Sequence, residues 1–337
     1  MSTAESHKAL IAPLQAALSG GDSGAVRLAL TELFAPDARI RLGALIGVLH
    51  GPDALWERAY APLLAAMPDL ERLSLIEMAG PRWGAQGGGD WIGLGGNFVG
   101  TFCAPFMGIA ATGRPVHMRY HEYLRVVEGR VVEMQALWDV PQLMHQAGVW
   151  PMAPQRGVDW MCPGPASGQG IKTGPRDAAV SEASVQIVWD MLHELQQGTA
   201  TTRQGGLGGF GHENAVWYRP TGLGTARGHR GIAQDICRQF REGLSENTRH
   251  LTEGVFFGEG DLVAFTGWPS GTAVHSGDGC LGLAPTGRRV TRASLDVWRV
   301  ENGLIRECWV MVDMLDLYAQ LGVDVFARMA QQIGEAA

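Results

Sequence analysis

The chain has 337 residues, five cysteines and a net charge of −7 at pH 7, and its length favours two domains. It has no basic run of the kind that nucleic-acid-binding modules carry, no apolar run long enough to cross a bilayer and no signal peptide over Met1–Leu18. We therefore expect no nucleic-acid partner, no membrane segment and, because the cysteines are odd in number and scattered, a cytoplasmic protein with reduced thiols.

The first part of the chain begins with helices and continues with strands. Asp22 or Ser23 can cap a helix that reaches Phe34, and Gly51-Pro52 begins a second helix that Pro62 is expected to bend. Strand-like stretches follow over 70–78 and 91–102. Residues 151–175 are rich in proline and glycine and are typical of an extended linker.

The same order returns after the linker. A helix is expected over 176–197 and another over 228–240, and strand-like stretches cover 212–219, 249–257 and 262–268. Helices followed by antiparallel strands predict an α+β fold class rather than alternating βαβ units. The predicted organisation is a domain over 1–150, a linker over 151–175 and a second domain over 176–337.

One stretch of the chain is present twice. Thr112–Val149 aligns without a gap on Thr286–Val323, with 13 identities in 38 positions, whereas average composition would give roughly 2 or 3. Both copies keep Thr-Gly-Arg, then Arg-Val, a glycine, a glutamate, an aspartate and the tail Leu-x-x-Gln-x-Gly-Val. Self-similarity over this length indicates a duplicated structural unit.

Each copy is predicted to be a β-hairpin that leads into a helix. The turns are Glu128-Gly129 and Asn302-Gly303, and Asn-Gly is the strongest short-range signal for a hairpin. A two-residue turn fixes the register of the strands. That register places on one face the pairs Glu122–Gln135, Tyr120–Leu137 and Met118–Asp139 in the first copy, and Asp296–Trp309, Ser294–Met311 and Arg292–Asp313 in the second.

These motifs resemble the SnoaL-like polyketide cyclases, which belong to the nuclear-transport-factor-2-like folds. The resemblance rests on the Thr-Gly-Arg start, the Arg-Val-x-x-Gly hairpin and the aspartate at the strand end before the Leu-x-x-Gln-x-Gly-Val tail. It implies two cone-shaped domains, each with N-terminal helices packed on a strongly curved antiparallel sheet. The order of the repeated elements agrees with this expectation.

The resemblance also implies a function. Cyclases of this family work without cofactor or metal, and an aspartate at the strand end acts as acid and base on a small, apolar carbonyl compound. By position this residue is Asp139 in the first half and Asp313 in the second. The expected reaction is an aldol cyclisation, an isomerisation or a hydrolysis, and the family includes ester cyclases.

The predicted face suggests the side chains that contact the substrate. They are Met118, Tyr120, Glu122, Leu137, Arg292, Asp296 and Trp309. Met118 would give Asp139 an apolar setting that disfavours the charged form of its carboxyl group, whereas Arg292 would favour the charged form of Asp313. We therefore favour Asp139 as the functional carboxylate.

Simpler interpretations exist for the same residues. Asp139 and Asp313 each precede a helix and are in position to cap it. Glu122 and Asp296 can be solvated edge charges or ion-pair partners of Arg119 and Arg292. The whole protein can then be a non-catalytic binder of an apolar ligand or a structural protein.

No cofactor motif is evident. The run 206–211 matches G-x-G-x-x-G, but it follows a helix and leads into a strand, so the strand–turn–helix context of a nucleotide site is missing. His117 and His121 lie on one strand with no third ligand at a suitable spacing, and we expect no metal site.

Apolar residues occur on both predicted faces of the sheets, so both faces need cover. We expect the second face of each domain to pack against the other domain as an intrachain pseudo-dimer, with a further homo-oligomer as the alternative. The residues assigned to that outer face are Tyr123, Val132, Met134, Ala136 and Trp138 in the first half and Ala293, Leu295, Val297, Cys308, Val310 and Val312 in the second.

Overall fold

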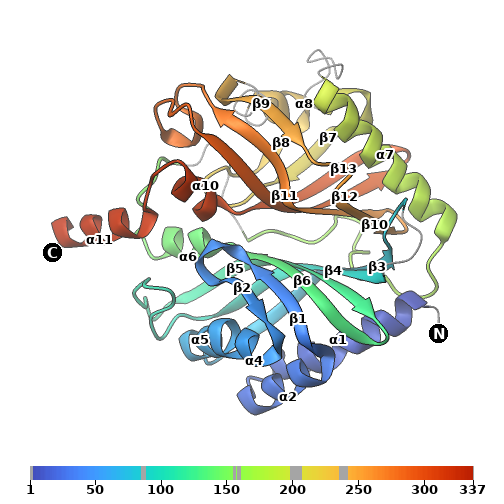
Figure 1. Ribbon diagram of the computed structural model, residues 1–337, viewed down its shortest axis with the longest axis horizontal. Coiled ribbons are helices and arrows are strands. Elements are labelled where there is room, and N and C mark those ends of the chain that lie inside the picture. The colour runs from blue at the N-terminus through green and yellow to red at the C-terminus, as the bar shows by residue number, and fades with distance from the viewer. Residues whose placement is uncertain are drawn as a thin grey trace. The chain divides into compact units, whose positions relative to one another are not determined.

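The computed structural model describes residues 3–84, 89–154, 157, 161–197, 207–234 and 242–336. The chain divides into two compact units, which are called the first and second domain from here on. The first consists of Met1–Trp150, Met161–Arg176 and Gln332–Ala337, and the second of Pro151–Trp160 and Asp177–Gln331. Figure 1 shows helices and a sheet in each of them.

Most helices of the first domain precede its central strands. Helix α1 spans Thr3–Ser19 and α2 spans Ser23–Leu33, and the side chain of Asp22 caps α2, which confirms the predicted start. After the short α3 (Gly43–Ile46), α4 (Gly51–Leu55), a π-helical turn (Trp56–Tyr60) and α5 (Ala61–Ala66) follow one another. Pro62 has no N–H group for the helical ladder, which accounts for the irregular turn before it.

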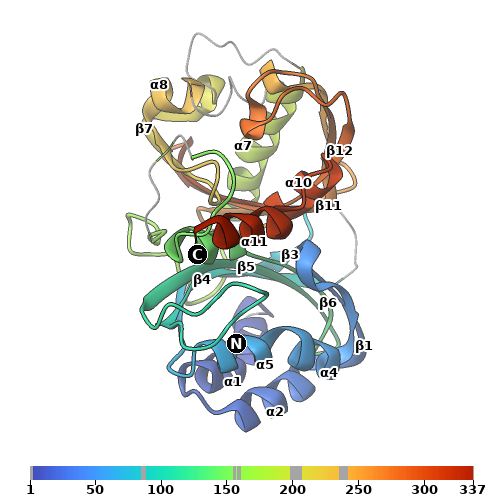
Figure 2. The same cartoon turned by 90° about the vertical axis from the view of Figure 1, so that its left-hand side faces the viewer.

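The sheet of the first domain has six strands in the order β2-β1-β6-β5-β4-β3. Their bounds are β1 Phe34–Leu42, β2 Gly47–His50, β3 Glu71–Pro81, β4 Asp90–Thr101, β5 Pro115–Val127 and β6 Arg130–Trp138, with α6 (Val140–Gln146) after the last. All neighbours are antiparallel except β1 and β6. Figure 2 shows α1, α2, α4 and α5 together on one side of this curved sheet.

The second domain repeats this topology, with β7 parallel to β13 where β1 is parallel to β6. Its strands follow the order β10-β11-β12-β13-β7-β8, and β9 also pairs with β11. The bounds are α7 Ala178–Gln197, β7 Gly211–Tyr218, β8 Ala226–Arg227, α8 Gly228–Ile232, β9 Leu244–Arg249, β10 Val255–Glu259, β11 Leu262–His275, β12 Arg289–Glu301, β13 Leu304–Val312, α10 Met314–Gln320 and α11 Val325–Ala336. Short 3-10 turns span Gly208–Phe210 and Cys280–Gly282.

The predicted fold class is therefore confirmed: the chain is α+β, with two separate sheets and helices packed on each. The helix expected over 228–240 is described only as far as residue 234, and the rest of it, with Cys237, lies outside the described residues. Part of the expected linker packs on the first domain, because Ile171 forms a parallel bridge with Glu77 and the backbone carbonyl of Cys162 accepts a hydrogen bond from Asn97.

Both hairpins turn at the predicted residues, but their strands are not in the predicted register. Glu128, Gly129, Asn302 and Gly303 all have positive φ, as a type I′ turn requires. A β-bulge then follows in each hairpin, at Arg125/Val126 and at Arg299/Val300. The bulge adds one residue to one strand, so every pair beyond it moves by one position.

The predicted pairs on the far side of the bulges are therefore wrong. Glu122 lies opposite Ala136 and Tyr120 opposite Trp138, while the N–H group of Asp139 donates to the carbonyl of Arg119. Asp296 lies opposite Val310 and Ser294 opposite Val312, while the N–H group of Asp313 donates to the carbonyl of Ala293.

A shift of one residue exchanges the two faces of a strand. Trp138 and Met134 were expected on the outer face, yet Trp138 contacts Tyr60 and Met134 contributes to a cavity beneath α1. We call this side the helix-covered face. The residues wrongly assigned to the outer face are Met134, Ala136 and Trp138 in β6 and Cys308, Val310 and Val312 in β13. Packing of the two domains through their outer faces stays a prediction.

The repeated glutamine of the tail has a structural role. The side chain of Gln146 accepts a hydrogen bond from the N–H group of His117 at 3.0 Å and donates to its carbonyl at 2.6 Å. Gln320 makes the same two bonds to Thr291, at 2.8 and 2.9 Å. These two bonds fix the helix after each strand-end aspartate to the first residues of β5 and of β12.

Gly303→Ala is expected to lower the stability of the second domain by about 1–2 kcal/mol, because a left-handed backbone disfavours a Cβ atom by that amount. Gly303 has φ +78° and an added Cβ atom would meet no other atom within 4 Å, so only the backbone conformation opposes the change. Denaturation in urea measures the effect. Gly231→Ala in α8 is the control, because it lies in the same domain and adds a Cβ atom in open space without a positive φ.

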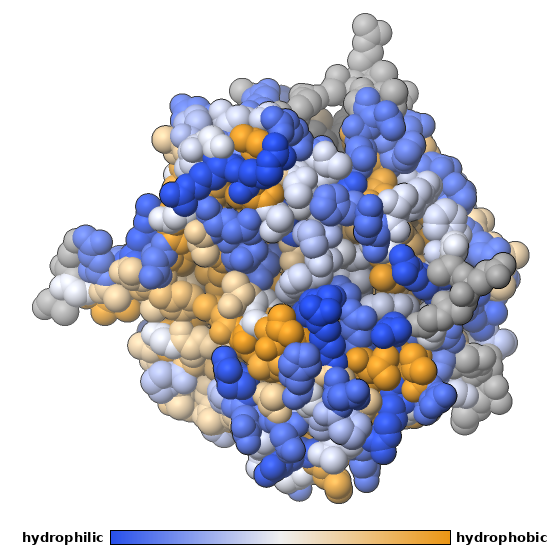
Figure 3. All heavy atoms as spheres, viewed as in Figure 1, coloured by the Kyte–Doolittle hydropathy of each residue, from blue (hydrophilic) through white to orange (hydrophobic). Residues whose placement is uncertain are grey.

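Among the described residues, no helix is both long and apolar enough to span a membrane. On the face drawn in Figure 3, hydrophilic and apolar side chains are interspersed.

Candidate functional site

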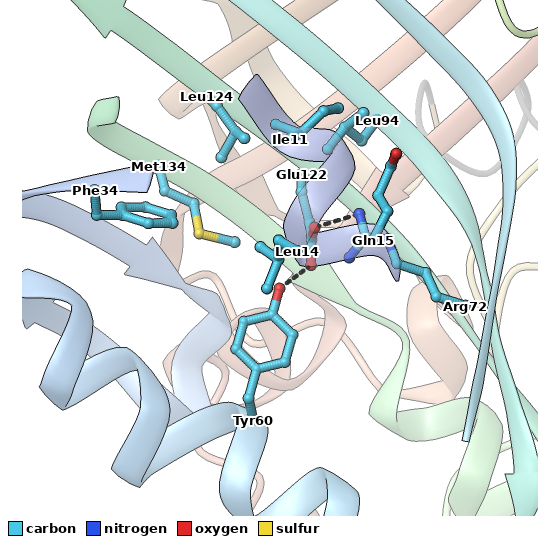
Figure 4. A pocket seen from close by; sticks show the side chains of 10 residues that line it. All are labelled: Ile11, Leu14, Gln15, Phe34, Tyr60, Arg72, Leu94, Glu122, Leu124 and Met134. Atoms are coloured by element: carbon cyan, nitrogen blue, oxygen red, sulfur yellow. Dashed lines mark hydrogen bonds and ion pairs between the residues drawn. The ribbon is translucent and has the colours of Figure 1, made fainter. Parts of the chain in front are cut away.

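The first domain buries one carboxylate and one guanidinium under its helices. Arg72 Nη2 lies 2.7 Å from Glu122 Oε2, and the two side chains are only 2% and 3% exposed. Trp138 Nε1 and the Tyr60 hydroxyl both donate to Glu122 Oε1, at 3.0 and 3.2 Å. We call these four residues the Glu122 cluster, and Figure 4 shows Tyr60 and Arg72 converging on the carboxylate.

Aromatic rings fill the space around the Glu122 cluster. The ring of Phe98 lies 4.6 Å from that of Tyr120 and 5.2 Å from that of Trp138, and Tyr60 meets Trp138 at 5.4 Å. The guanidinium carbon of Arg72 lies 4.1 Å above the Tyr120 ring, a cation–π contact. Each ring is held by its neighbours, so the interior of this domain is tightly packed.

A small cavity remains beside the cluster. Its wall consists of the residues labelled in Figure 4, which are Ile11, Leu14, Gln15, Phe34, Tyr60, Arg72, Leu94, Glu122, Leu124 and Met134. The cavity has a volume of about 10 Å³, which is at the lower limit for one water molecule. Sites for drug-sized molecules measure about 300–1,000 Å³, so this cavity has no room for a substrate.

The protonation of the cluster is fixed by its burial and its charges. Burial, and then the charge of Glu122, raises the pKa of Tyr60 well above its ordinary value, so the phenol stays a donor. Burial lowers the pKa of Arg72, but the negative charge of Glu122 outweighs it and the net direction is upward. Arg72 is therefore a permanent cation, and it neutralises a carboxylate that is almost fully buried.

The second domain has a related but more open arrangement at the equivalent point of its sheet. Asp296, which the repeat aligns with Glu122, is fully buried, and Oδ2 accepts long hydrogen bonds of 3.4 Å from Arg249 Nη1 and from the Ser294 hydroxyl. Arg292 lies on the same face and is 8% exposed. These four residues are the Asp296 cluster.

The Asp296 cluster reaches from the interior to the solvent. The side chain of Asp296 is 0% exposed and that of Arg249 is 27% exposed. Arg292 Nη2 donates to the side chain of Asn247 at 2.6 Å, and Asn247 itself is exposed. Among the described residues, Arg292 Nε has no hydrogen-bond acceptor.

Burial shifts the ionisation of this cluster towards neutral forms. It raises the pKa of Asp296 to about 6, although Arg249 and Ser294 act in the opposite direction. It lowers the pKa of Arg292 to about 10, and the charge of Arg249 adds to this effect. A carboxylate with a pKa near 6 is mostly ionised at neutral pH and can still accept a proton readily, which is what a general base requires.

The two strand-end aspartates occupy helix N-cap positions. Asp313 Oδ1 accepts a hydrogen bond from the N–H group of Asp316 at 3.1 Å, so this side chain caps α10. Asp139 is buried at the start of α6, and its side chain makes no capping bond. It does not contribute to the wall of the cavity beside Glu122.

The expected neighbours of these aspartates are not found. The N–H group of Asp313 donates to the carbonyl of Ala293 and the side chain of Arg292 donates to Asn247, so the predicted pairing of Arg292 with Asp313 is wrong. Asp139 is aligned with Arg119 through the backbone, not with Met118. The reasons for ranking Asp139 above Asp313 therefore no longer hold, and catalysis by either residue stays a prediction.

The predicted substrate contacts separate into two groups. Met118, Tyr120 and Glu122 lie on the helix-covered face of the first domain, and Arg292 and Asp296 lie on that of the second. Leu137 and Trp309 lie on the other face, because they pair with His121 and Val297 across the shifted register. The ring of Trp309 stacks on Tyr218 at 5.6 Å.

Sequence reasoning missed the two arginines that pair with the buried carboxylates. Arg119 and Arg292 were the expected partners, but Arg72 on β3 and Arg249 on β9 take that role. A single arginine within the apolar strand-like stretch 70–78 was the available signal, since a buried cation needs a partner. Tyr60 gave no signal, because a tyrosine in an amphipathic helix is usually a core residue.

Within the described part of the chain, no group of three or more histidine, cysteine, aspartate or glutamate side chains is placed to hold a metal ion. Burial, with the charges of Asp296 and Glu307, raises the pKa of the Cys308 thiol well above its ordinary value. A thiol in that state is a poor nucleophile.

The family of the chain follows from a match to the SnoaL-like polyketide cyclase model over residues 15–147 and again over 195–321. These two segments make up most of the sequence, and each corresponds to one of the two sheets with its helices. The chain belongs to the SnoaL-like polyketide cyclase family.

Several solved structures are similar to one half of the chain. IdmH from Streptomyces antibioticus is 28% identical, with 42% of this chain and 98% of IdmH covered and a TM-score of 0.34. A SnoaL-like protein from Jannaschia sp. CCS1 is 19% identical, with 42% and 90% covered and a TM-score of 0.35. An NTF2-like protein from Burkholderia xenovorans LB400 is 21% identical, with 42% and 97% covered and a TM-score of 0.32. Among curated proteins, no match is found.

Proposed function

We propose that the protein catalyses cofactor-independent acid/base chemistry on carbonyl compounds, of the kind that closes a ring or isomerises a carbon skeleton. The observation that supports this most directly is the carboxylate–guanidinium pair under the helices of each domain. In the first domain the pair is Glu122 on β5 and Arg72 on β3. In the second domain it is Asp296 on β12 and Arg249 on β9, at related positions. Membership of the SnoaL-like polyketide cyclase family supports the same class of reaction.

Such a pair suits the removal of a proton from a carbon atom next to a carbonyl group. The carboxylate takes the proton, and the electron pair of the C–H bond moves into an enolate. A guanidinium held nearby stabilises the negative oxygen of that enolate, and preorganised charge of this kind usually lowers the barrier more than any other single effect. The enolate carbon then bonds to a second carbonyl carbon, whose oxygen receives the proton from the carboxyl group.

The buried setting of the carboxylate is part of this chemistry. A solvated aspartate has a pKa near 4 and is a weak base towards carbon acids, whereas burial raises the pKa of Asp296 to about 6. The substrate carbon still has to be acidified by flanking carbonyl groups, because even this base is far weaker than the enolate of a simple ketone. The proposed substrates are therefore small, largely apolar compounds with closely spaced carbonyl groups.

Deuterium exchange tests the proposal without knowledge of the natural substrate. The probe is a methyl-substituted β-diketone with a single hydrogen between its carbonyl groups and a terminal carboxylate, called the diketone acid; its methyl ester is the diketone ester. Both are incubated with the protein in deuterated buffer and followed by proton NMR. The wild-type protein is expected to accelerate exchange of at least one probe, and no acceleration of either would overturn the proposal.

Two double variants identify the carboxylates that act. Exchange is expected to be lost in Glu122→Gln/Asp296→Asn. If this variant keeps the accelerated exchange and Asp139→Asn/Asp313→Asn loses it, the general base is one of the strand-end aspartates that the family resemblance implies. Circular dichroism of each variant checks that it has folded.

A further inference from the structure

The two domains differ at the positions that decide whether substrate fits. The repeat aligns Tyr120 with Ser294 and Trp138 with Val312. The repeat also aligns Met118 with Arg292. Across the sheet, Met118 lies opposite Phe98 and Arg292 lies opposite Gly271, so Gly271 takes the place of Phe98. Three positions that hold aromatic residues in the first domain thus hold a serine, a valine and a glycine in the second.

The opposite change occurs nearer the hairpin turn. Leu124 aligns with Trp298, and the partners of the two carboxylates across the sheet are Leu94 in the first domain and Phe265 in the second. The second domain therefore has larger side chains towards the hairpin and smaller ones towards the start of β12. On the same side of Asp296 as Arg292, the serine, the valine and the glycine are therefore smaller than the aromatic residues at the matching positions of the first domain.

The charges of the two clusters differ as well. The Glu122 cluster has one guanidinium for one carboxylate, both almost fully buried, although Arg72 Nε and Nη1 also have no acceptor among the described residues. The Asp296 cluster has two guanidinium groups, Arg249 and Arg292, for one carboxylate, and Arg292 replaces the apolar Met118 of the first domain. A buried cation in excess of its counter-ions is costly unless a ligand brings the missing negative charge.

Arg292 has the geometry of an anion receptor. It is 8% exposed, its only hydrogen bond from the guanidinium among the described residues goes to the exposed Asn247, and its Nε atom has no acceptor. A carboxylate that bound the free edge of this guanidinium would gain charge-assisted hydrogen bonds with a fixed orientation. Its remaining atoms would then extend towards Asp296.

We propose that the second domain holds the working site and takes a carbonyl substrate that bears a carboxylate, with Arg292 as the residue that binds this group, whereas the interior of the first domain is closed to substrate. The chemistry at Asp296 rests on the proposed function, but the recognition of the anion by Arg292 does not. Arg292 thus determines specificity, and the aromatic filling gives the first domain a structural role.

Binding of the diketone acid and the diketone ester, measured by titration calorimetry, tests the proposal. The wild-type protein is expected to bind the acid at least tenfold more tightly than the ester. Arg292→Met should remove this preference and weaken the acid at least tenfold, while Arg292→Lys should retain part of it. Equal affinity of the wild-type protein for the two probes, or unchanged affinity of Arg292→Met, would overturn it.

The matched control is Arg289→Met. Arg289 lies on the same strand, is exposed and pairs with Glu246, so this variant removes one positive charge without touching the cluster. Its affinity for the acid is expected to equal that of the wild-type protein. An equal loss in Arg289→Met and Arg292→Met would show attraction by the overall charge and would contradict a specific role of Arg292.

Thermal unfolding separates a binding role from a structural one. Arg292→Met removes a buried, incompletely paired charge, so its Tm without probe is expected to equal or exceed that of the wild-type protein. A clear fall in Tm for both Arg292→Met and Arg292→Lys would make Arg292 structural.

Hydrogen exchange of the full chain with the acid locates the site. Protection is expected in peptides of β9 and β12, and protection confined to β3 and β5 would place the ligand in the first domain and overturn the proposal. The acid can bind as expected while the wild-type protein does not accelerate deuterium exchange of either probe. In that case the anion site stands and the proposed function fails.

Discussion

Arg72→Met is expected to lower the free energy of unfolding of the first domain by about 3–5 kcal/mol, the usual effect of removing one partner of a buried ion pair. Arg72 and Glu122 are 2% and 3% exposed, so water cannot replace the lost guanidinium. Tyr60 and Trp138 would still donate to the carboxylate, but neither brings a positive charge. Hydrogen exchange in peptides of β4, β5 and β6 measures the loss in the full chain.

The second domain offers a matched comparison. Arg249→Met removes the corresponding guanidinium, but Arg249 is 27% exposed and lies 3.4 Å from Asp296, whose raised pKa lets it take up a proton instead. Its effect is expected to be less than half that of Arg72→Met. The double variant Arg72→Met/Glu122→Gln should recover much of the loss, since no uncompensated charge remains, and equal effects of the two arginines without recovery would contradict the asymmetry between the clusters.

The sequence predicted the architecture well because its strongest signals are local. The type I′ turns depend on Glu128-Gly129 and Asn302-Gly303, and these adopt positive φ as expected. Asp22 caps its helix for a reason that concerns only neighbouring residues. Helix α1 was not anticipated, although Ile11, Leu14 and Leu18 have helical spacing and are buried.

The register was missed because a bulge leaves no mark on a strand that is apolar on both faces. One signal was nevertheless present in both copies. Arg125 pairs with Glu133 and Arg299 pairs with Glu307, and opposite charges directly across a sheet are favourable. A strict two-residue turn would have misaligned each of these pairs by one residue, so the repeated arginine and glutamate required the bulge.

The candidate site was only partly accessible from the sequence for the same reason. Glu122 and Asp296 were singled out, but their partners Arg72 and Arg249 come from strands far away along the chain. Whether an interior is filled depends on which rings meet, such as Phe98 with Tyr120 and Trp138. That contact exists only once the strands are in register.

Under the proposed assignment, the duplication lets one chain combine a stable scaffold with a site that lowers stability. In the first domain a balanced ion pair and stacked rings stabilise the fold, and the cavity left over measures about 10 Å³. In the second domain the second guanidinium and the buried carboxylate with a pKa near 6 are both unfavourable for stability. Buried groups of that kind are typical of functional sites, where stability is exchanged for chemistry.

Asp296→Asn is expected to reduce deuterium exchange of the diketone acid by a factor of about 10²–10⁴, the usual loss when a general base is removed. The amide keeps the shape of the side chain but cannot accept the proton. In the wild-type protein the rate should rise with pH through about 6, the pKa to which burial raises Asp296, and level off above it, because only the ionised carboxylate acts as a base. Proton NMR between pH 5 and pH 8 measures the profile.

The stability of the second domain should also depend on the ionisation of Asp296. It should fall with rising pH, whereas the exchange rate rises. The folded-state pKa of Asp296, about 6, lies above the value near 3.9 of an unfolded chain, so the native state binds more protons between these two pH values. The contribution of Asp296 to stability is therefore fully present below about pH 4 and is lost as pH rises towards 6. Urea denaturation should show this decrease of stability with pH in the wild-type protein and a smaller decrease in Asp296→Asn.

Glu246→Gln is the control, because it changes an exposed carboxylate on β9. It should keep both the exchange rate and the pH dependence of stability of the wild-type protein. An Asp296→Asn protein that kept the wild-type pH profile of exchange would exclude Asp296 as the base.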